Sequence, residues 1–200
     1  VLPPFSGSWS DCWVTNFKQP HNKQYDGKPI AHVAEMRKQH PVDAMCDLLL
    51  DENLGVSIVI AVTDMSTLPD VMEHSLYMVG SDSVMIGDFP APMAWGCYPQ
   101  FLSYMVREEK RLTLQEAIRK MTSYPAARLG ISDRGMLKDG LKADITVFDP
   151  VTIRPNASKI SPRQLSTGVE YVIVNGTIVI DQGKHTNALP GRSLRRGERS

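Results

Sequence analysis

The apolar positions in the first third of the chain change from helical spacing to short, nearly continuous β-branched runs. Residues 1–27 are rich in Pro, Gly, Ser and Asn, which predicts loop with one short strand near 12–16. Apolar side chains recur at helical spacing over 30–37 and 42–50, so these segments are predicted to be helices. The run 56–62 is almost entirely apolar, which predicts a strand buried on both faces, as in a parallel sheet.

A second apolar run, 76–80, follows a short predicted helix over 67–74. A strand, a helix and a strand within about 25 residues predict a βαβ unit with a right-handed crossover. A Pro-rich loop is expected over 89–99, before the next helix begins. The first part of the chain, up to about residue 131, is therefore expected to be α/β.

The next helix has a clear start signal, and the last third of the chain has β character. Thr113-Leu114-Gln115-Glu116 is the pattern of a capping box, which predicts a helix beginning there. A strand is expected over 143–149. Asn175-Gly176 separates β-branched runs at 171–174 and 177–180, which predicts a two-residue hairpin because both turn residues tolerate positive φ.

Charge and cysteine content exclude several classes of protein. The 22 Lys and Arg residues balance 22 Asp and Glu residues, which argues against a nucleic-acid partner because phosphate binding requires a basic face. The three cysteines, Cys12, Cys46 and Cys97, form no C-x-x-C pair, so neither a disulfide scaffold nor a cysteine zinc site is expected. A reducing, cytoplasmic location is predicted. No apolar run reaches about 18 residues, so no membrane partner is expected.

Asp82 is the leading candidate for a chemical role. It directly follows the predicted strand 76–80, at the carboxyl edge of a parallel sheet, where α/β proteins place their active sites. Its small neighbours Gly80, Ser81 and Ser83 leave the backbone open to a ligand. A carboxylate there can take a proton from a metal-bound water. The alternative is that Asp82 caps the following turn, since Asp and Ser favour such positions.

The histidines predict no metal site in this chain. No pair is spaced as H-x-H, H-x-x-x-H or H-E-x-x-H, the patterns that place two imidazoles on one metal. The five are His21, His32, His40, His74 and His185.

Several motifs in order resemble the N-acyl-D-amino-acid deacylases, or D-aminoacylases, of the amidohydrolase superfamily. The first are Gly80-Ser81-Asp82 and Trp95-Gly96-Cys97-Tyr98-Pro99. Further along are Glu116-Ala117-Ile118-Arg119-Lys120-Met121-Thr122-Ser123, Asp133-Arg134-Gly135, Ala143-Asp144, Val147-Phe148-Asp149-Pro150, Val174-Asn175-Gly176 and Pro190-Gly191-Arg192. The resemblance runs from about residue 40 to residue 196.

The resemblance implies a metal-dependent hydrolase on a (β/α)₈ barrel with a small β-sandwich. In that family zinc activates a water that attacks the amide carbonyl of an N-acyl-D-amino acid. Asp82 would be the general base and later the proton donor to the leaving amine. Ser81, Ser83 and Trp95 are the candidates for substrate contact.

Some family positions differ in this chain. Ala91-Pro92-Met93 stands where His-Pro-Arg is common, Gln100 replaces a second arginine, and Ser83 replaces a glycine. The family's metal ligands come from earlier strands that have no counterpart here, so no metal ligand is assigned to this chain.

The expected protein is the C-terminal portion of such an enzyme, with the last two βα units of the barrel in 1–131 and part of the sandwich in 132–200. A whole barrel alone needs about 250 residues, and the start at Val1 without an initiator Met also suggests a piece. The expected partners are an N-acyl amino acid and the N-terminal portion of the same enzyme. Alone, the chain is expected to bind no zinc and to be inactive. The alternative is an inactive fragment or remnant that acts as a folded interaction module.

Overall fold

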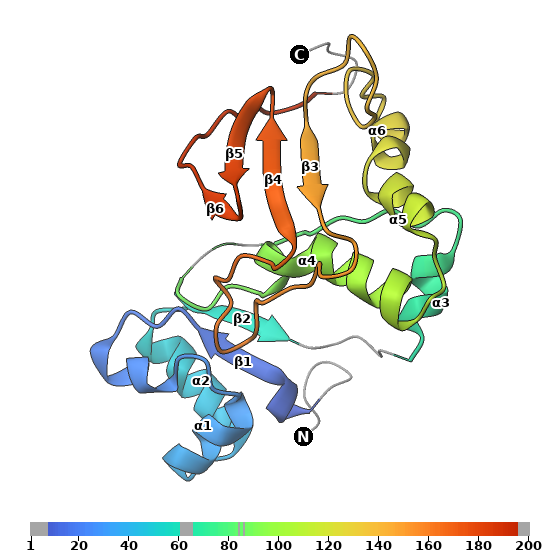
Figure 1. Ribbon diagram of the computed structural model, residues 1–200. Coiled ribbons are helices and arrows are strands. Elements are labelled where there is room, and N and C mark those ends of the chain that lie inside the picture. The colour runs from blue at the N-terminus through green and yellow to red at the C-terminus, as the bar shows by residue number, and fades with distance from the viewer. Residues whose placement is uncertain (1–7, 61–65, 84, 86, 196–200) are drawn as a thin grey trace. The chain divides into compact units, whose positions relative to one another are not determined.

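The polypeptide is shared between two units whose segments alternate along the chain. The computed structural model describes residues 8–60, 66–83, 85 and 87–195 (Figure 1). The first unit takes the chain up to residue 65 together with 82–94 and 157–163, and the second takes 66–81, 95–156 and 164–200.

The first unit pairs two helices with a short two-stranded sheet. Its elements are η1 (Trp9–Asp11), β1 (Cys12–Thr15), η2 (Pro20–Tyr25), α1 (Ile30–Arg37), α2 (Pro41–Asp51) and β2 (Ser57–Ile60). The predicted strand near 12–16 and the two predicted helices are confirmed. α1 ends at Lys38 in a left-handed conformation with φ of 54°, and α2 begins with Pro41 at its first position.

The core of this unit is apolar and continuous across its elements. Phe17 and Tyr25 meet edge to face with ring centroids 6.3 Å apart. The buried members of the core are Cys12, Val14, Phe17, Tyr25, Ile30, Val33 and Leu48.

The buried carboxylate of Glu52 holds the loop that joins β1 to η2. Only 4% of Glu52 is exposed. It accepts hydrogen bonds from the backbone N–H of Lys18 at 2.7 Å, the backbone N–H of Gln19 at 3.1 Å, and Asn22 Nδ2 at 2.9 Å. Burial by itself would raise the pKa of Glu52, but these donors outweigh it and the pKa lies below its ordinary value. The carboxylate therefore stays ionised inside the unit.

The prediction of a parallel βαβ unit over 56–80 is wrong for the described residues. β2 pairs antiparallel with β1, Cys12 opposite Ile60, and Ile58 is 45% exposed rather than buried on both faces. Residues 61 and 62 of the predicted strand lie outside the described residues. The segment 76–80 is not a strand: Tyr77 N–H donates to His74 O and Val79 N–H to Lys120 O, so its amides bond to loop and helix carbonyls.

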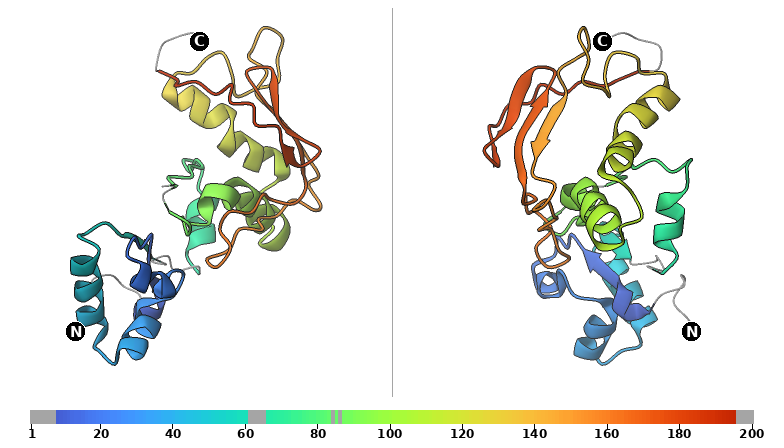
Figure 2. Two further views of the ribbon diagram at one scale, coloured as in Figure 1. Left: turned by 90° about the vertical axis from the view of Figure 1, so that its left-hand side faces the viewer. Right: turned by 45° about the vertical axis from the view of Figure 1, so that its right-hand side comes forward.

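The second unit carries a sheet and four α-helices within the described residues. Its helical elements are α3 (Leu68–Glu73), α4 (Met93–Leu102), the π-helical η3 (Ser103–Glu108), α5 (Leu114–Met121) and α6 (Ser123–Leu129). Its strands are β3 (Ile145–Phe148), β4 (Val169–Val174), β5 (Thr177–Asp181) and β6 (Lys184–His185), ordered β3-β4-β5-β6 and all antiparallel. Figure 2 shows α5 and α6 on the same side of this sheet.

The local turn and cap signals are confirmed in this unit, with two differences. Asn175 and Gly176 both have positive φ, 47° and 79°, in the predicted hairpin between β4 and β5. Thr113 Oγ1 accepts from Glu116 N–H at 3.2 Å, but the Glu116 carboxylate bonds Arg119 instead of reaching back to the cap. The expected loop over 89–99 gives way to α4 at Met93, and this helix contains Pro99 in its interior although proline lacks a backbone N–H donor.

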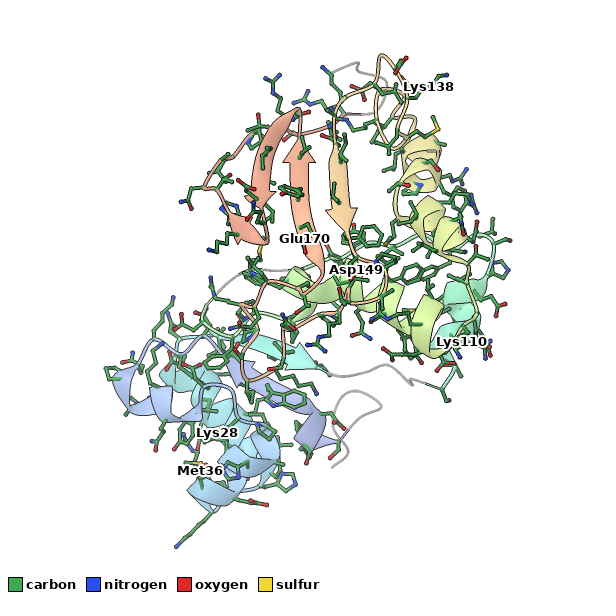
Figure 3. The ribbon with its side chains drawn as sticks, viewed as in Figure 1. Lys28, Met36, Lys110, Lys138, Asp149 and Glu170 are labelled. Atoms are coloured by element: carbon green, nitrogen blue, oxygen red, sulfur yellow. The ribbon has the colours of Figure 1, made fainter. Side chains whose placement is uncertain are left out.

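The loop after β3 is fixed by its own first residue. Figure 3 labels Asp149 just beyond β3 and Glu170 within β4. The Asp149 carboxylate accepts from Val151 N–H at 2.8 Å and from Thr152 Oγ1 at 2.7 Å, and these bonds lower its pKa. The strand predicted at 143–149 is confirmed as the shorter β3, Ile145–Phe148.

None of the helices in the described part of the chain combines the length and the apolar character that crossing a bilayer requires.

Replacing Glu52 with Gln should destabilise the first unit by roughly 1–3 kcal/mol, because an amide leaves at least one buried N–H donor without an acceptor. The folded pKa of Glu52 lies below its ordinary value of 4.5, so its contribution is present above pH 4.5 and is lost as the pH falls through the folded pKa. Urea unfolding at pH 7 and at pH 3 measures both effects. The gap between wild type and Glu52→Gln should narrow at pH 3, whereas Glu35→Gln, on an exposed side chain, should change little.

Gly168 and Gly176 form a matched pair for testing close packing in the second unit. Both have positive φ, but a Cβ at Gly168 would lie 2.6 Å from Ile153 N, whereas a Cβ at Gly176 would meet no atom within 4 Å. Gly176→Ala should cost about 1–2 kcal/mol from the left-handed conformation. Gly168→Ala should cost roughly 3 kcal/mol or more, since backbone must shift. Equal losses in urea unfolding would contradict this account.

Candidate functional site

Asp82 is exposed and stands in an unusual backbone conformation. Its φ of 37° lies in the left-handed region, which Asp tolerates better than most residues. Its carboxylate makes no hydrogen bond or ion pair with any residue that the structure describes, so the alternative role as a turn cap has no bond to support it. The side chain is therefore open to a ligand or a water.

The segment that leads to Asp82 is anchored by α5. Lys120 is fully buried, and its Nζ donates to His74 O at 2.5 Å and to Tyr77 O at 3.4 Å. The Lys120 carbonyl accepts from Val79 N–H at 3.1 Å. Burial lowers the pKa of Lys120, while the carboxylate of Glu116, 4.0 Å from Nζ, raises it.

The same segment also packs against α4. The ring of Tyr77 stacks on that of Phe101 with centroids 6.0 Å apart, and Val79 is 8% exposed. The Cys97 thiol donates to Gly80 O at 3.8 Å, and burial raises the pKa of this thiol, which keeps it a donor. Residues 77–80 are thus fixed from two sides although they form no regular element.

The candidates for substrate contact are divided between the units. Ser81 and Ser83 are half-buried; Ser81 belongs to the second unit, whereas Asp82 and Ser83 belong to the first. Trp95 is half-buried in the first turn of α4, and its carbonyl accepts from Ser166 Oγ at 3.1 Å. Neither unit by itself brings all four candidate residues together.

Cavities lie among the described residues of the second unit. Trp95 helps to line a cavity of about 150 Å³ against β4 and β5. A larger cavity of about 560 Å³ lies between α4, α5 and the sheet, and its mainly apolar lining includes Leu102, Ile118, Phe148 and Val172. Asp82 lines neither of them.

The described residues of this chain do not form a set of ligands that fits a zinc ion. Among them, no three His, Cys, Asp or Glu side chains are placed to hold one metal ion. His21 contacts Asp51, His32 contacts Glu35, and the Nδ1 atoms of His40, His74 and His185 accept backbone N–H bonds. Asp82 alone offers a single carboxylate, whereas a catalytic zinc site takes about three protein ligands.

Lys120 is the residue that the apolar pattern could not reveal. The apolar residues of α5 are Leu114, Ala117, Ile118 and Met121, yet Lys120 is more completely buried than any of these except Ala117. Its spacing of three residues from Ala117 was the available signal, because positions i and i+3 share a helix face.

Comparison with known proteins places most of the chain in one family. Residues 19–180 match the model of the Amidohydrolase family. The N-acyl-D-aspartate deacylase of Alcaligenes xylosoxydans xylosoxydans is 35% identical over 163 residues, which cover 78% of this chain and 32% of that enzyme. The N-acyl-D-glutamate deacylase of the same organism is 41% identical over 126 residues, 63% of this chain and 26% of that enzyme.

Solved structures resemble the chain as well. A crystal structure of D-aminoacylase matches with a TM-score of 0.82 and 27% identity, over 92% of this chain and 38% of that one. An N-acyl-D-glutamate deacylase from Bordetella bronchiseptica matches with a TM-score of 0.75 and 31% identity, over 85% of this chain and 34% of that one. That structure is complexed with zinc and a phosphonate inhibitor, a mimic of the reaction's tetrahedral intermediate.

The chain spans about a third of the length of the curated relatives it matches. The family match covers well over half of the chain, and the fold of the described residues follows that of part of D-aminoacylase. The chain belongs to the amidohydrolase family.

Proposed function

We propose that this chain is the C-terminal part of a zinc-dependent hydrolase that removes the acyl group from N-acyl-D-amino acids. The observation that carries the proposal is the likeness to a solved D-aminoacylase over 92% of the chain. In this proposal residues 1–131 belong to the C-terminal part of a (β/α)₈ barrel, and 132–200 supply part of the small β-sandwich. The bond that breaks is a non-peptide C–N amide bond.

Asp82 is the residue that we assign to proton transfer. Its exposed carboxylate, unpaired among the described residues, is free to accept a proton from the water that attacks the amide carbonyl. It then gives this proton to the amine nitrogen as the C–N bond breaks, and the products are a carboxylic acid and a D-amino acid. General acid–base catalysis of this kind is worth roughly 10²- to 10⁴-fold in rate.

The zinc ligands of the active enzyme must come from another part of the protein. The described residues bring together no donor set of their own, and a relative's structure was solved with zinc bound. The metal, when bound, supplies Lewis-acid chemistry to the hydrolysis.

The substrate is proposed as a class rather than as one compound. Met93 and Gln100 are both exposed and stand where the family that this chain resembles commonly has arginine. Neither side chain carries a charge for the substrate carboxylate, so that contact is assigned to another part of the enzyme. Ser81, Ser83 and Trp95 remain the proposed substrate contacts within this chain.

The proposed partner of the chain is the N-terminal portion of the same enzyme. One face of the sheet turns Val172 toward the 560 Å³ cavity. Val147 and Ile178 lie on the opposite face and are 47% and 45% exposed. Covering an apolar sheet face of this kind with another chain segment removes apolar surface from water and so lowers the free energy.

Asp82→Asn in the enzyme that contains this chain should lower kcat by roughly 10²- to 10⁴-fold while zinc content stays the same, because the amide cannot take the proton. Turnover of N-acetyl-D-amino acids, with the L-enantiomers as the specificity check, measures the effect. Asp88→Asn is the matched control, since the Asp88 side chain is 80% exposed on the same stretch of chain. Full activity of Asp82→Asn would overturn the assignment.

The 200-residue chain by itself should hydrolyse no N-acyl-D-amino acid and should retain no stoichiometric zinc after dialysis. One carboxylate cannot replace a donor set of three or more ligands. Metal analysis and a turnover assay with added zinc test both statements. Co-expression with the N-terminal portion should restore turnover, and zinc-dependent turnover by the chain alone would contradict the proposal.

A further inference from the structure

We propose that Lys120 is a positioning residue for Asp82: its buried ammonium group and its backbone carbonyl hold residues 74–79, which carry the chain into Gly80-Ser81-Asp82. This inference rests on the proposed function of Asp82, but the contacts behind it lie entirely within the second unit. They join α5 to the segment that follows α3.

Three hydrogen bonds join Lys120 to the segment, at residues 74, 77 and 79. Lys120 Nζ donates to His74 O, directly after α3, and to Tyr77 O, three residues further on. The Lys120 carbonyl accepts from Val79 N–H. The spacing pins the start, the middle and the end of residues 74–79. Only Gly80 and Ser81 separate Val79, the last bonded residue, from Asp82.

No regular structure replaces these bonds. The segment has no strand partner among the described residues. Its His74 carbonyl also accepts from Tyr77 N–H, whereas its Tyr77 carbonyl is bonded by the Lys120 side chain. Other contacts of the segment include the Tyr77–Phe101 stack, the packing of Val79 in the core, the Cys97–Gly80 bond and the bond from Leu76 N–H to His74 Nδ1. Stacking and apolar packing fix position but are less directional than hydrogen bonds, so Lys120 sets the course of the backbone.

A lysine is a costly choice for this position if packing were the only requirement. Burying an ammonium group is unfavourable unless hydrogen bonds and a counter-charge compensate it. Compensation is present: two carbonyls accept from Nζ, Glu116 Oε1 lies 4.0 Å away, and the Tyr77 ring centroid lies 5.9 Å away. An apolar side chain would fill the same volume on α5 without making these bonds.

Arg107 provides a matched control within the same unit. Its guanidinium donates to Pro150 O at 3.1 Å and to Ile153 O at 2.5 Å, so it also ties a loop through two carbonyls. That loop lies between β3 and β4 and does not lead to Asp82. Arg107→Met and Lys120→Met therefore remove the same kind of interaction from two different loops.

The first experiment measures kcat, KM and thermal stability in the enzyme that contains this chain. Lys120→Met should lower kcat by about 10²-fold with KM changed less than about 3-fold, because a displacement of about 1 Å in a reacting group has an effect of that size. Arg107→Met should lower Tm by a similar amount and leave kcat within about 2-fold of the wild type. Lys120→Arg, which keeps the donors, should recover at least about 10-fold of the lost kcat.

The second experiment uses amide hydrogen exchange on the 200-residue chain and does not depend on activity. Lys120→Met keeps the backbone carbonyl that Val79 N–H bonds but loses both Nζ bonds, so opening of the segment should speed exchange at Val79 by at least about 10-fold. Arg107→Met should leave Val79 unchanged. If Lys120→Met does not fold, Lys120→Gln, with its shorter side chain and neutral donor, replaces it in both experiments.

The outcomes separate this inference from the proposed function. Unchanged kcat in Lys120→Met, equal loss of kcat in Lys120→Met and Arg107→Met, or unchanged exchange at Val79 would overturn the positioning role. Full activity of Asp82→Asn would instead overturn the proposed function, whatever Lys120→Met does to exchange.

Discussion

The backbone of a segment that forms neither helix nor strand must still find hydrogen-bond partners when it is buried, and in both units a buried charged side chain meets this requirement. In the first unit the carboxylate of Glu52 receives the amides of the loop after β1. In the second unit the ammonium group of Lys120 donates to the carbonyls after α3. The negative carboxylate accepts from backbone N–H groups, and the positive ammonium group donates to backbone carbonyls. Removing either side chain takes these bonds from the loop that it supports, which costs about 1 kcal/mol or more for each bond.

Elements with a local cause could be predicted from the sequence, and elements that depend on distant partners could not. The hairpin at Asn175-Gly176 and the start of α5 at Thr113 follow from two or three neighbouring residues. The β-branched run at 56–62 correctly indicated a strand, but its direction and exposure depend on β1, more than forty positions earlier in the chain. Residues 76–80 have a strand's composition and no strand to pair with among the described residues.

The candidate site shows the same division. Asp82 was found because a small, polar turn follows an apolar run and because the surrounding motifs resemble a known family. The structure adds that its carboxylate is exposed and that its backbone is left-handed. Lys120 was not singled out, since a lysine on a helix is normally a surface residue. Only the tertiary structure shows that it lies inside, next to the segment that carries Asp82.

The interleaved order of the two units has a consequence for how the chain acquires its structure during synthesis. Strands β4, β5 and β6 are joined by short turns, so their pairing costs little loop-closure entropy. The first unit instead needs residues made much later: Lys159 Nζ lies 3.7 Å from the ring of Trp13, and Arg163 donates to Gly87 O. On the ribosome, these two contacts of the first unit can form only after residues 159 and 163 have been made, although β1 and β2 can pair earlier. The amino-terminal half is made first, yet neither unit is complete until the last third of the chain has been made.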